Sequence, residues 1–565
     1  MAKKNTGIFT RKAMGLIIGL VGIFLLVFIV FYTISRVFRP QDLATMLPKD
    51  RVVALTQISV NEHHEQVQRF YEELNKYDVY HPNNMNVIVD SLLNTDVTQE
   101  VYPWLDRQIG AAVLQQNDSQ EATDIVLFFE TSDQAKTIAF LESRGLQTQD
   151  DYLLSEAYEG VDIYRYALSQ TYNFMFLNNY LVVAENEAVL QSIIDADDTY
   201  KKQLIADDLY QKVSQNLPVN YLMFGYADIG RAREVLKQNE AFMSQKGKEL
   251  LAFEPFLKLY KACGVTAVME NGNVALQTFT ALDQEYLAGK DFIDFETKYR
   301  AHLLNYIPKD VVFFAGGFDL QKQMHRYADI MSAGGDVSYL IFEGMLRAKK
   351  NEYIGEEIDL EEDIYPLLEG EYGMAINQRE GYEATTILIE LADPLKDKEI
   401  IESIIDSFIR KSAILAPTVV EVELEDGTTM EEIQTLPEEI VRSTEDYHGY
   451  EINVLTVGTQ PWGVYYIIVD DVFIATSQKD QMHASIDLVM NRGDSVKNSD
   501  IYRESIAPVV RTTDEVLYVD FKYMIEKLGG MPDYLTSYAE PFESVGSGTN
   551  YFKDGISSIH YIKIN

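Results

Sequence analysis

The chain has 565 residues, 48 Lys+Arg against 88 Asp+Glu, and a formal net charge of −40. The chain is too long to fold around one hydrophobic core, because single cores stop growing at about 250–300 residues. An apolar content of 47% argues against a disordered chain, the acidic balance argues against nucleic acid as a partner, and the single cysteine, Cys263, excludes an intrachain disulfide.

The N-terminal segment predicts a membrane anchor. Between Ala13 and Tyr32 the chain is apolar and carries no charge. About twenty helical residues span the roughly 30 Å of bilayer hydrocarbon, so we expect residues 1–12 to form a cytoplasmic tail and residues 13–35 a single transmembrane helix. The alternative is a cleaved signal peptide. Its apolar region is shorter, about 7–15 residues, and ends in a small-residue cleavage site that does not follow here.

The charges around this segment predict its orientation. Basic residues are more numerous before the segment than after it: Lys3, Lys4, Arg11 and Lys12 against Arg36 and Arg39. Positive charge favours the cytoplasmic side, so we expect residues 40–565 outside the cytoplasmic membrane, in the periplasm or at the cell surface. Gly15 and Gly19 form a GxxxG pattern, which would let two helices approach closely and form a homodimer.

The rest of the chain carries one pattern twice. Leu47-Pro48-Lys49-Asp50 recurs as Ile307-Pro308-Lys309-Asp310, and later matches keep the same order. Further matched segments are 101–105 with 364–368, 121–123 with 383–385, 179–183 with 471–475, and 226–228 with 518–520. Collinear matches indicate an internal duplication. We therefore expect two homologous exported domains, at 43–290 and 301–565.

Two further segments complete the predicted organisation. Apolar residues at helical spacing predict a connecting helix at 291–306. The offset between matched residues increases inside the second copy, which predicts an insertion at about 409–441 with a hairpin turn at Asp426-Gly427. Short strands alternate with helices in each copy. The predicted fold class is therefore α+β: two homologous tandem domains, each with a largely antiparallel sheet and packed helices, preceded by one transmembrane helix.

The recurring pattern resembles a bacterial family known only as a domain of unknown function, number three thousand three hundred and fifty-two. The segments that carry the resemblance are Leu47-Pro48-Lys49-Asp50, Val101-Tyr102-Pro103-Trp104-Leu105, Ile125–Glu130 before Asp133, Tyr158-Glu159-Gly160 and Asn179–Ala184. It covers nearly all of 43–565, with Leu367 in place of the tryptophan in the second copy and Asp106 in place of a typical glycine. The resemblance implies an anchored exported protein in two tandem copies and supplies no catalytic residue.

Motifs for catalysis or cofactor binding are missing from the sequence. No glycine-rich loop is followed by Lys-Ser/Thr, and no G-x-S-x-G elbow occurs. His63-His64-Glu65 lacks the spacing of a zinc-binding helix. We expect Cys263 to be a buried free thiol. We therefore predict no catalytic residue, no metal site and no cofactor, and leave the binding residues open.

Two acidic clusters are the candidates for cation binding. They are Asp195, Asp197 and Asp198, and the longer run Glu356, Glu357, Asp359, Glu361, Glu362 and Asp363. Neither has EF-hand spacing, so we expect solvated acidic surfaces. The 36 tyrosines favour half-buried sheet positions, with an exposed sugar- or protein-binding surface as the alternative.

Three classes of function remain open. The first is a non-enzymatic binding or scaffolding module of the cell envelope, whose partners are the bilayer through residues 13–35 and an unidentified envelope protein or ligand. The second is a carrier of lipid or another apolar ligand, since a sheet covered by helices can enclose an apolar cavity. The third is a carboxylate-dependent hydrolase of envelope glycan, which would need two carboxyls about 5–9.5 Å apart.

Overall fold

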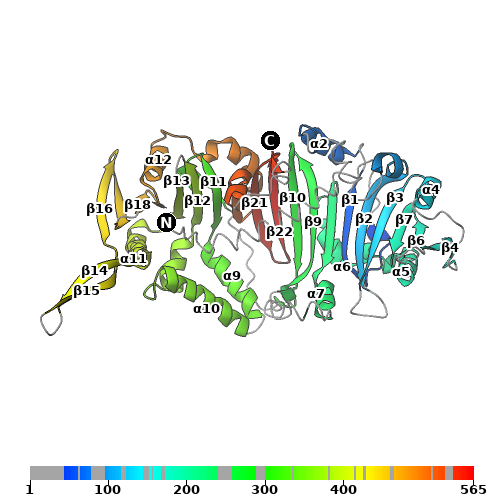
Figure 1. Cartoon of the computed structure of the whole chain (residues 1–565), viewed down its shortest axis with the longest axis horizontal. Coiled ribbons are helices and arrows are strands. Elements are labelled where there is room, and N and C mark those ends of the chain that lie inside the picture. Colours follow the sequence, from blue (N-terminus) through cyan, green and yellow to red (C-terminus); the bar gives the residue numbers. More distant parts are fainter. Residues whose placement is uncertain are drawn as a thin grey trace. The chain divides into compact units, whose positions relative to one another are not determined.

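The computed structural model describes most of the chain after residue 42, in two compact units. The described residues are 43–60, 64–77, 80, 96–115, 123–143, 152–154, 157–166, 172–238, 243, 257–287, 299–333, 336–379, 382–412, 415–423, 428–458, 463–510, 513–527 and 539–565. Unit 1 comprises Met1–Ala288, Phe521–Ser544 and Phe552–Asn565, and unit 2 comprises Gly289–Asp520 and Val545–Tyr551. Each unit is built on antiparallel strands (Figure 1).

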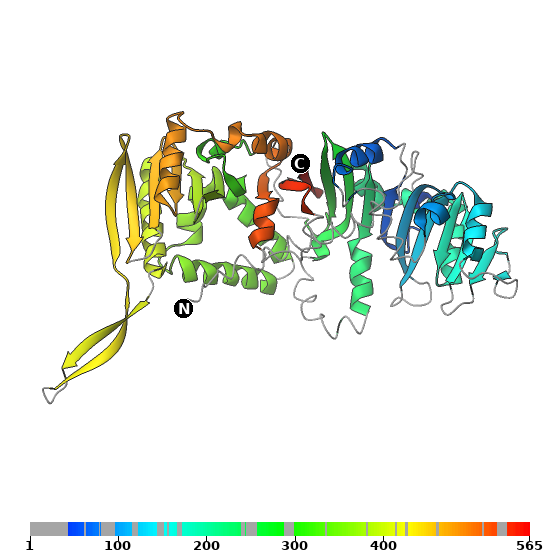
Figure 2. The same cartoon turned by 45° about the horizontal axis from the view of Figure 1, so that its top comes forward.

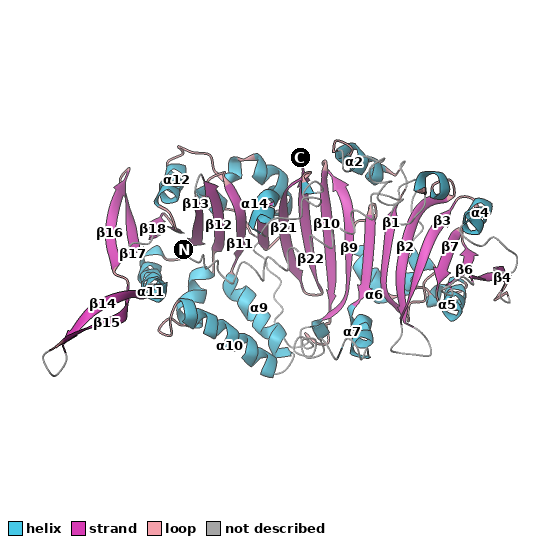
Figure 3. Ribbon diagram, viewed as in Figure 1, coloured by secondary structure: helices cyan, strands magenta, loops and turns pink. Residues whose placement is uncertain are grey.

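The strands of unit 1 pair antiparallel in the order β4-β5-β6-β7-β3-β2-β1-β8-β9-β10-β22 (Figure 3). In that order they are β4 (Tyr152–Leu154), β5 (Ile163–Tyr166), β6 (Tyr172–Leu177), β7 (Tyr180–Ala184), β3 (Thr123–Thr131), β2 (Leu105–Gln115), β1 (Val52–Ser59), β8 (Met223–Asp228), β9 (Tyr260–Glu270), β10 (Asn273–Leu282) and β22 (Gly555–Ile564). Tight turns join neighbours: Asn178 and Asn179, with φ of 49° and 65°, connect β6 to β7.

Helices pack against this sheet, and two of them, Glu187–Asp197 and Asp208–Gln215, enclose the main core of unit 1. The described helices of unit 1 are α2 (Glu65–Leu74), α4 (Gln134–Ser143), α5 (Glu187–Asp197), α6 (Asp208–Gln215), α7 (Ile229–Gln238) and α14 (Phe521–Lys527). The Asn186 side chain caps α5 by accepting the Ala188 N–H at 3.0 Å, which fixes where the helix begins. Val189 and Ile193 of α5 are then buried against Val126 and Phe128 of β3 in one hydrophobic cluster.

Unit 2 repeats this pairing order over eight strands, as β16-β17-β18-β19-β13-β12-β11-β20. These are β16 (Ile440–Tyr447), β17 (Tyr450–Val457), β18 (Gly463–Val469), β19 (Val472–Thr476), β13 (Tyr382–Glu390), β12 (Glu371–Arg379), β11 (Val311–Phe318) and β20 (Glu515–Asp520). Strand β21 (Phe542–Phe552) contributes Val545–Tyr551 to unit 2. Strands β1 and β11 come first in chain order in their units, and both break register near their starts. The break lies between Val52 and Ala54 in β1 and between Val311 and Phe313 in β11.

In the part of unit 2 that the structure describes, the helices are α9 (Leu320–Ala333), α10 (Asp336–Tyr353), α11 (Pro394–Ser412), α12 (Lys479–Val489) and α13 (Ala507–Val510). Helix α11 packs on β13, β17 and β19, and the side chains of Ile401, Ile405 and Ile409 are buried there at helical spacing. Phe473 of β19 and Leu455 of β17 complete this cluster.

A separate hairpin of unit 2 lies within the predicted insertion at 409–441. Strands β14 (Leu415–Glu423) and β15 (Thr429–Pro437) pair antiparallel and form a two-stranded sheet of their own. The hairpin extends away from the strands of unit 2, and Figure 2 shows the same extension from a second direction. Asp426-Gly427, the expected turn, lies outside the described residues.

The predicted fold class is wrong in dividing the chain into two tandem domains, one in each half of the chain. Strand pairing among the described residues does not follow that division. Strand β22 pairs with β10, so residues 552–565 belong to unit 1 and not to the second half of the chain. Local sequence matching could not show this pairing, because it joins the end of the chain to its middle.

The predicted transmembrane helix is not part of the described fold. No helix among the described residues is long and apolar enough to cross a membrane. The tail at 1–12 and the segment 13–35, with Gly15 and Gly19, lie outside the described residues. Of the predicted connecting helix at 291–306, residues 299–306 are described, and Leu303–Tyr306 forms a short 3-10 helix.

Candidate functional site

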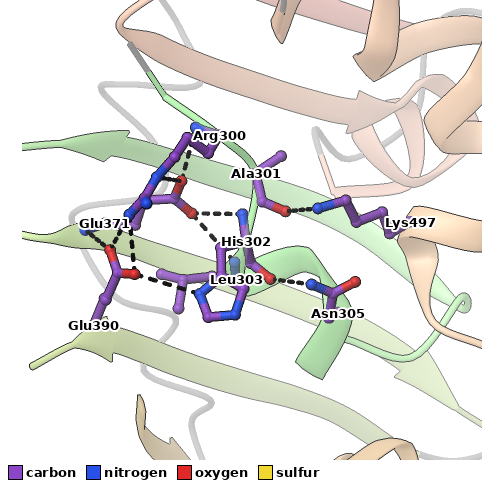
Figure 4. Close-up of polar contacts among 8 residues, drawn as sticks. All are labelled: Arg300, Ala301, His302, Leu303, Asn305, Glu371, Glu390 and Lys497. Carbon is purple, nitrogen blue, oxygen red and sulfur yellow. Dashed lines mark hydrogen bonds and ion pairs between the residues drawn. The ribbon is translucent and has the colours of Figure 1, made fainter. Parts of the chain in front are cut away.

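Glu371, the first residue of β12, has a carboxylate with several main-chain hydrogen bonds. Its side chain is fully buried and accepts three main-chain N–H groups, from Arg300 at 2.7 Å, His302 at 2.7 Å and Leu303 at 3.2 Å (Figure 4). Between these donors, Ala301 has a φ of 57°, a conformation that residues other than glycine rarely adopt. The carboxylate therefore holds a strained turn in place through the amides on both sides of it.

A second carboxylate, Glu390 at the end of β13, extends this cluster toward solvent. It accepts the main-chain N–H of Glu371 at 3.1 Å and two bonds from the Arg300 guanidinium at 2.9 and 3.0 Å. The His302 Nδ1 lies 3.4 Å from its Oε1. The Glu390 side chain is 16% exposed and that of His302 is 36% exposed, so this part of the cluster is in contact with solvent.

Lys497 closes the other side of the turn. Its ammonium donates to the Ala301 carbonyl at 2.9 Å, and the Asn305 side chain donates to the His302 carbonyl at 2.8 Å (Figure 4). Burial lowers the pKa of Lys497, while the nearby Glu371 charge raises it. We call these residues (Arg300–Leu303, Asn305, Glu371, Glu390 and Lys497) the Glu371 cluster.

Unit 1 contains a related arrangement at the equivalent positions of β2 and β3. Glu130 occupies the position of Glu390 and accepts the main-chain N–H of Gln108, which stands where unit 2 has Glu371. Glu130 is 5% exposed, and desolvation raises the pKa of its carboxyl to about 7, against the opposing attraction of Arg107 at 3.7 Å. The Gln108 side chain donates to the buried Tyr180 hydroxyl at 2.8 Å.

The chemistry that these arrangements allow is limited by their bonding. In Glu371 both oxygens accept main-chain N–H groups, so this carboxylate stabilises the turn rather than meeting a substrate. Glu390 and His302 lie within ion-pair distance of each other on the side of the cluster that meets solvent. Among the described residues, no group of three or more His, Cys, Asp or Glu side chains could hold a metal ion.

The acidic clusters named from the sequence have local partners. Asp359 caps a short helix by accepting the N–H groups of Glu361 and Glu362 at 2.8 and 3.2 Å, and Glu357 accepts from Ser407 and Arg410. Asp359 is thus bonded at the start of a short helix, and Glu357 is bonded to the side of α11. The two carboxylates therefore have different partners.

The carboxylates of the shorter acidic run also have separate hydrogen-bond partners. Asp195 accepts the Tyr158 hydroxyl at 3.0 Å, and Asp197 accepts the Asn178 amide at 2.7 Å. In unit 2 the Tyr447 hydroxyl meets Asp487 at 3.3 Å in the position matching Tyr158 and Asp195.

The histidines, the cysteine and the tryptophan named from the sequence lie at separate places in the chain. His63 is outside the described residues, and burial lowers the pKa of His64. Cys263 is partly buried in β9, and desolvation raises the pKa of its thiol. Trp104 is 3% exposed and its ring contacts Phe129 and Phe140.

Neither Glu371 nor Glu390 was expected from the sequence. A sequence signal for Glu390 does exist. It is an acidic residue at the end of a strand with alternating apolar residues, and Glu130 has the same place in the first copy. Glu371 has no such signal, because the first copy carries Gln108 there.

A different feature of unit 2 is a partly exposed apolar row on the sheet face opposite the buried residues Ala375 and Leu388. Direct cross-strand partners form this row over five strands: Leu517, Ala315, Met374, Ile387 and Ala475. Met374 is 40% exposed and Ile387 46% exposed. We call this row the open face of unit 2.

Unit 1 has an open face at the same strand positions. Thr56, Ala111, Leu127 and Val183 are successive cross-strand partners there. Leu127 is 38% exposed, and Ile125, on the same face of β3, is 62% exposed. Exposed apolar side chains that cluster on one face mark interaction sites more often than apolar residues scattered singly.

The described residues thus define a protein of two units built on antiparallel strands and packed helices, with an open apolar face in each unit and a buried carboxylate cluster in unit 2. The family described as protein of unknown function, DUF3352, matches residues 13–528, so the chain belongs to this family, as the resemblance in the sequence predicted. No curated protein matches the chain.

Among solved structures, crystal form III of TP0453 matches with a TM-score of 0.22 and 9% identity, over 43% of this chain and 80% of that chain. Crystal form I of the same protein matches with the same TM-score and identity, over 43% and 79%. A likeness at this TM-score carries no argument about fold or function.

Proposed function

We propose that this protein is a non-enzymatic binding or scaffolding module of the bacterial cell envelope. In this proposal the chain associates with the bilayer through residues 13–35, and residues 40–565 lie outside the cytoplasm. The uncharged stretch Ala13–Tyr32 and the excess of basic residues before it support this placement.

The observation that carries the binding role is the open face of unit 2. Met374 and Ile387 are directly opposite each other on β12 and β13, and each leaves more than a third of its surface in water. Burial of apolar surface gains about 25 cal/mol per Å², so covering this row would favour association with a partner. The open face of unit 1 offers Leu127 at the strand position of Ile387, with the exposed Ile125 on the same face of β3.

The repeated strand order supports a further part of the proposal, that the family pattern occurs twice in the chain. Two isolated bridges add to the repeated pairing, between Pro48 and Gln203 and between Pro308 and Ser495. Two open faces on one chain would let it contact one extended partner or two copies of a smaller one.

A photo-crosslinking experiment in living cells tests the binding role. p-Benzoylphenylalanine replaces Ile387 in one variant, Leu127 in a second, and the exposed Glu72 of α2 in a control. We expect discrete protein adducts from positions 387 and 127 but not from 72. Adducts should weaken when Met374→Thr is added beside position 387. The absence of adducts at both open faces would contradict the proposal.

The open faces also favour a second candidate, a carrier of lipid or another apolar ligand. An apolar row that binds acyl chains would give crosslinks to lipid instead of protein at positions 387 and 127. Organic extraction of the purified chain followed by mass spectrometry would then recover stoichiometric lipid, whereas the binding module would release none.

A further inference from the structure

The β14–β15 hairpin of unit 2 is strongly acidic and exposed on both of its faces. Between residues 415 and 437 the sequence has six acidic residues, and no basic residue occurs between Lys411 and Arg442. Val419 and Ile433 are direct cross-strand partners, 60% and 72% exposed. The hairpin therefore presents apolar and acidic side chains together.

Two physical features show that this hairpin is incomplete by itself. Two-stranded sheets in water are marginally stable, and a third strand with apolar contacts stabilises them. Glu421 and Glu431 are also direct cross-strand partners, and both are exposed. Like charges in this position destabilise a strand pair, so a cation placed beside them would relieve the repulsion.

The two outer edges of the hairpin differ in what they offer to a third strand. Pro417 in β14 has no N–H to donate, whereas β15 from Thr429 to Leu436 contains no proline. An added strand would therefore pair along β15. There it would meet the order Met430, Glu431, Glu432 and Ile433, which is apolar, acidic, acidic and apolar.

We infer that the β14–β15 hairpin docks an extended, basic segment of a protein partner, which adds to the edge of β15 as a third strand. The complementary order in that segment is apolar, basic, basic and apolar. Charge disfavours the other occupants: a second copy of this chain carries the same acidic hairpin, and bilayer surfaces are anionic. This inference rests on the proposed binding function and names a partner class for it.

Two peptides of identical composition test the inference on the full-length protein in detergent. The probe contains Val-Lys-Lys-Val between threonines, an order that reads the same in parallel and antiparallel pairing. The control peptide contains Lys-Val-Val-Lys, which places lysine beside Met430 and Ile433. Fluorescence anisotropy should show the probe binding at least about tenfold more tightly than the control, with an affinity that falls as salt rises.

Matched variants separate the hairpin from the general acidity of the chain. Glu421→Lys/Glu431→Lys keeps two like charges opposite each other and should weaken probe binding about tenfold. Glu72→Lys/Glu142→Lys changes the net charge equally on exposed helical positions of unit 1 and should leave binding unchanged. Ile433→Thr should weaken binding by removing the apolar contact while keeping a β-branched side chain.

Equal binding of both peptides, undetectable binding at millimolar peptide, or equal effects of the two charge reversals would each overturn the inference. Self-association of the chain that Ile433→Thr abolishes, in place of peptide binding, would overturn it as well. These outcomes differ from failure of the proposed function, because crosslinking at positions 387 and 127 does not involve the hairpin.

Discussion

The main-chain N–H of Glu371 donates to the carboxylate of Glu390 at 3.1 Å, so the first residue of β12 is bonded to the last residue of β13. Gln108 and Glu130 repeat this bond in unit 1. The two units differ in the buried side chain, because Glu371 is anionic whereas Gln108 is neutral. A negative charge at position 371 strengthens the hydrogen bonds from the three main-chain N–H groups that donate to this side chain.

Replacing this charge should loosen the turn at residues 300–303. Glu371→Gln turns one acceptor oxygen into a donor that faces an N–H group, which costs about 1–3 kcal/mol. Hydrogen–deuterium exchange of the peptide containing Arg300–Leu303 should therefore become roughly 10- to 100-fold faster. Glu369→Gln, at an exposed neighbouring position, is the control. Unchanged protection in Glu371→Gln would show that the carboxylate does not hold the turn.

Glu130 should make the stability of unit 1 depend on pH. Desolvation raises the pKa of this carboxyl from 4.5 to about 7 in the folded chain. The folded chain then binds more protons than the unfolded chain, so the free energy of unfolding falls as pH rises from about 4.5 to about 7. Glu130→Gln should remove most of this fall, which is at most about 3 kcal/mol.

Trp104 reports this effect locally, because its ring contacts Phe129 beside Glu130. In a Trp462→Phe background, urea unfolding followed by Trp104 fluorescence at pH 5 and pH 7.5 gives the pH dependence. Glu142→Gln, at an exposed position of α4, should keep the pH dependence of the parent. Identical pH profiles for the parent and Glu130→Gln would refute the raised pKa.

The two tyrosine–aspartate bonds should differ in strength. The Tyr158 hydroxyl is 3.0 Å from Asp195, whereas the Tyr447 hydroxyl is 3.3 Å or more from Asp487. Tyr158→Phe should therefore cost about 1 kcal/mol in urea unfolding, and Tyr447→Phe less. Tyr200→Phe, at a residue 61% exposed, is the control. A larger loss for Tyr447→Phe would contradict the geometry.

Cys263 should react slowly with alkylating reagents. Burial raises the pKa of its thiol, which lowers the fraction of reactive thiolate. At pH 8 we expect iodoacetamide to modify it at least about tenfold more slowly than a small-molecule thiol, and at the same rate once the chain is unfolded in urea. Rapid modification of the native chain would show that the thiol is accessible.

Local signals in the sequence predicted local parts of this fold. The strands β14 and β15 lie where the spacing between matched residues of the two copies changes in the sequence. Each of these features depends on residues close together in the chain, so local pattern is enough to find them.

The assignment of the chain end to unit 1 could not be predicted in this way. The pairing of β22 with β10 joins residues such as Ile562 and Val274, which are far apart in sequence and share no local pattern. The Glu371 cluster is equally non-local, because it combines a strand end, a turn about 70 residues earlier and Lys497. Its members become related only through the pairing of β12 with β13.

The compartment of residues 40–565 is the point on which an envelope binding role depends, and thiol labelling tests it most directly. Val219→Cys introduces a cysteine at a position 89% exposed, against the slowly reacting Cys263, and Asn5→Cys places one in the N-terminal tail. A membrane-impermeant maleimide added to intact spheroplasts should label position 219 and not position 5. Labelling of position 219 only after lysis would contradict the account.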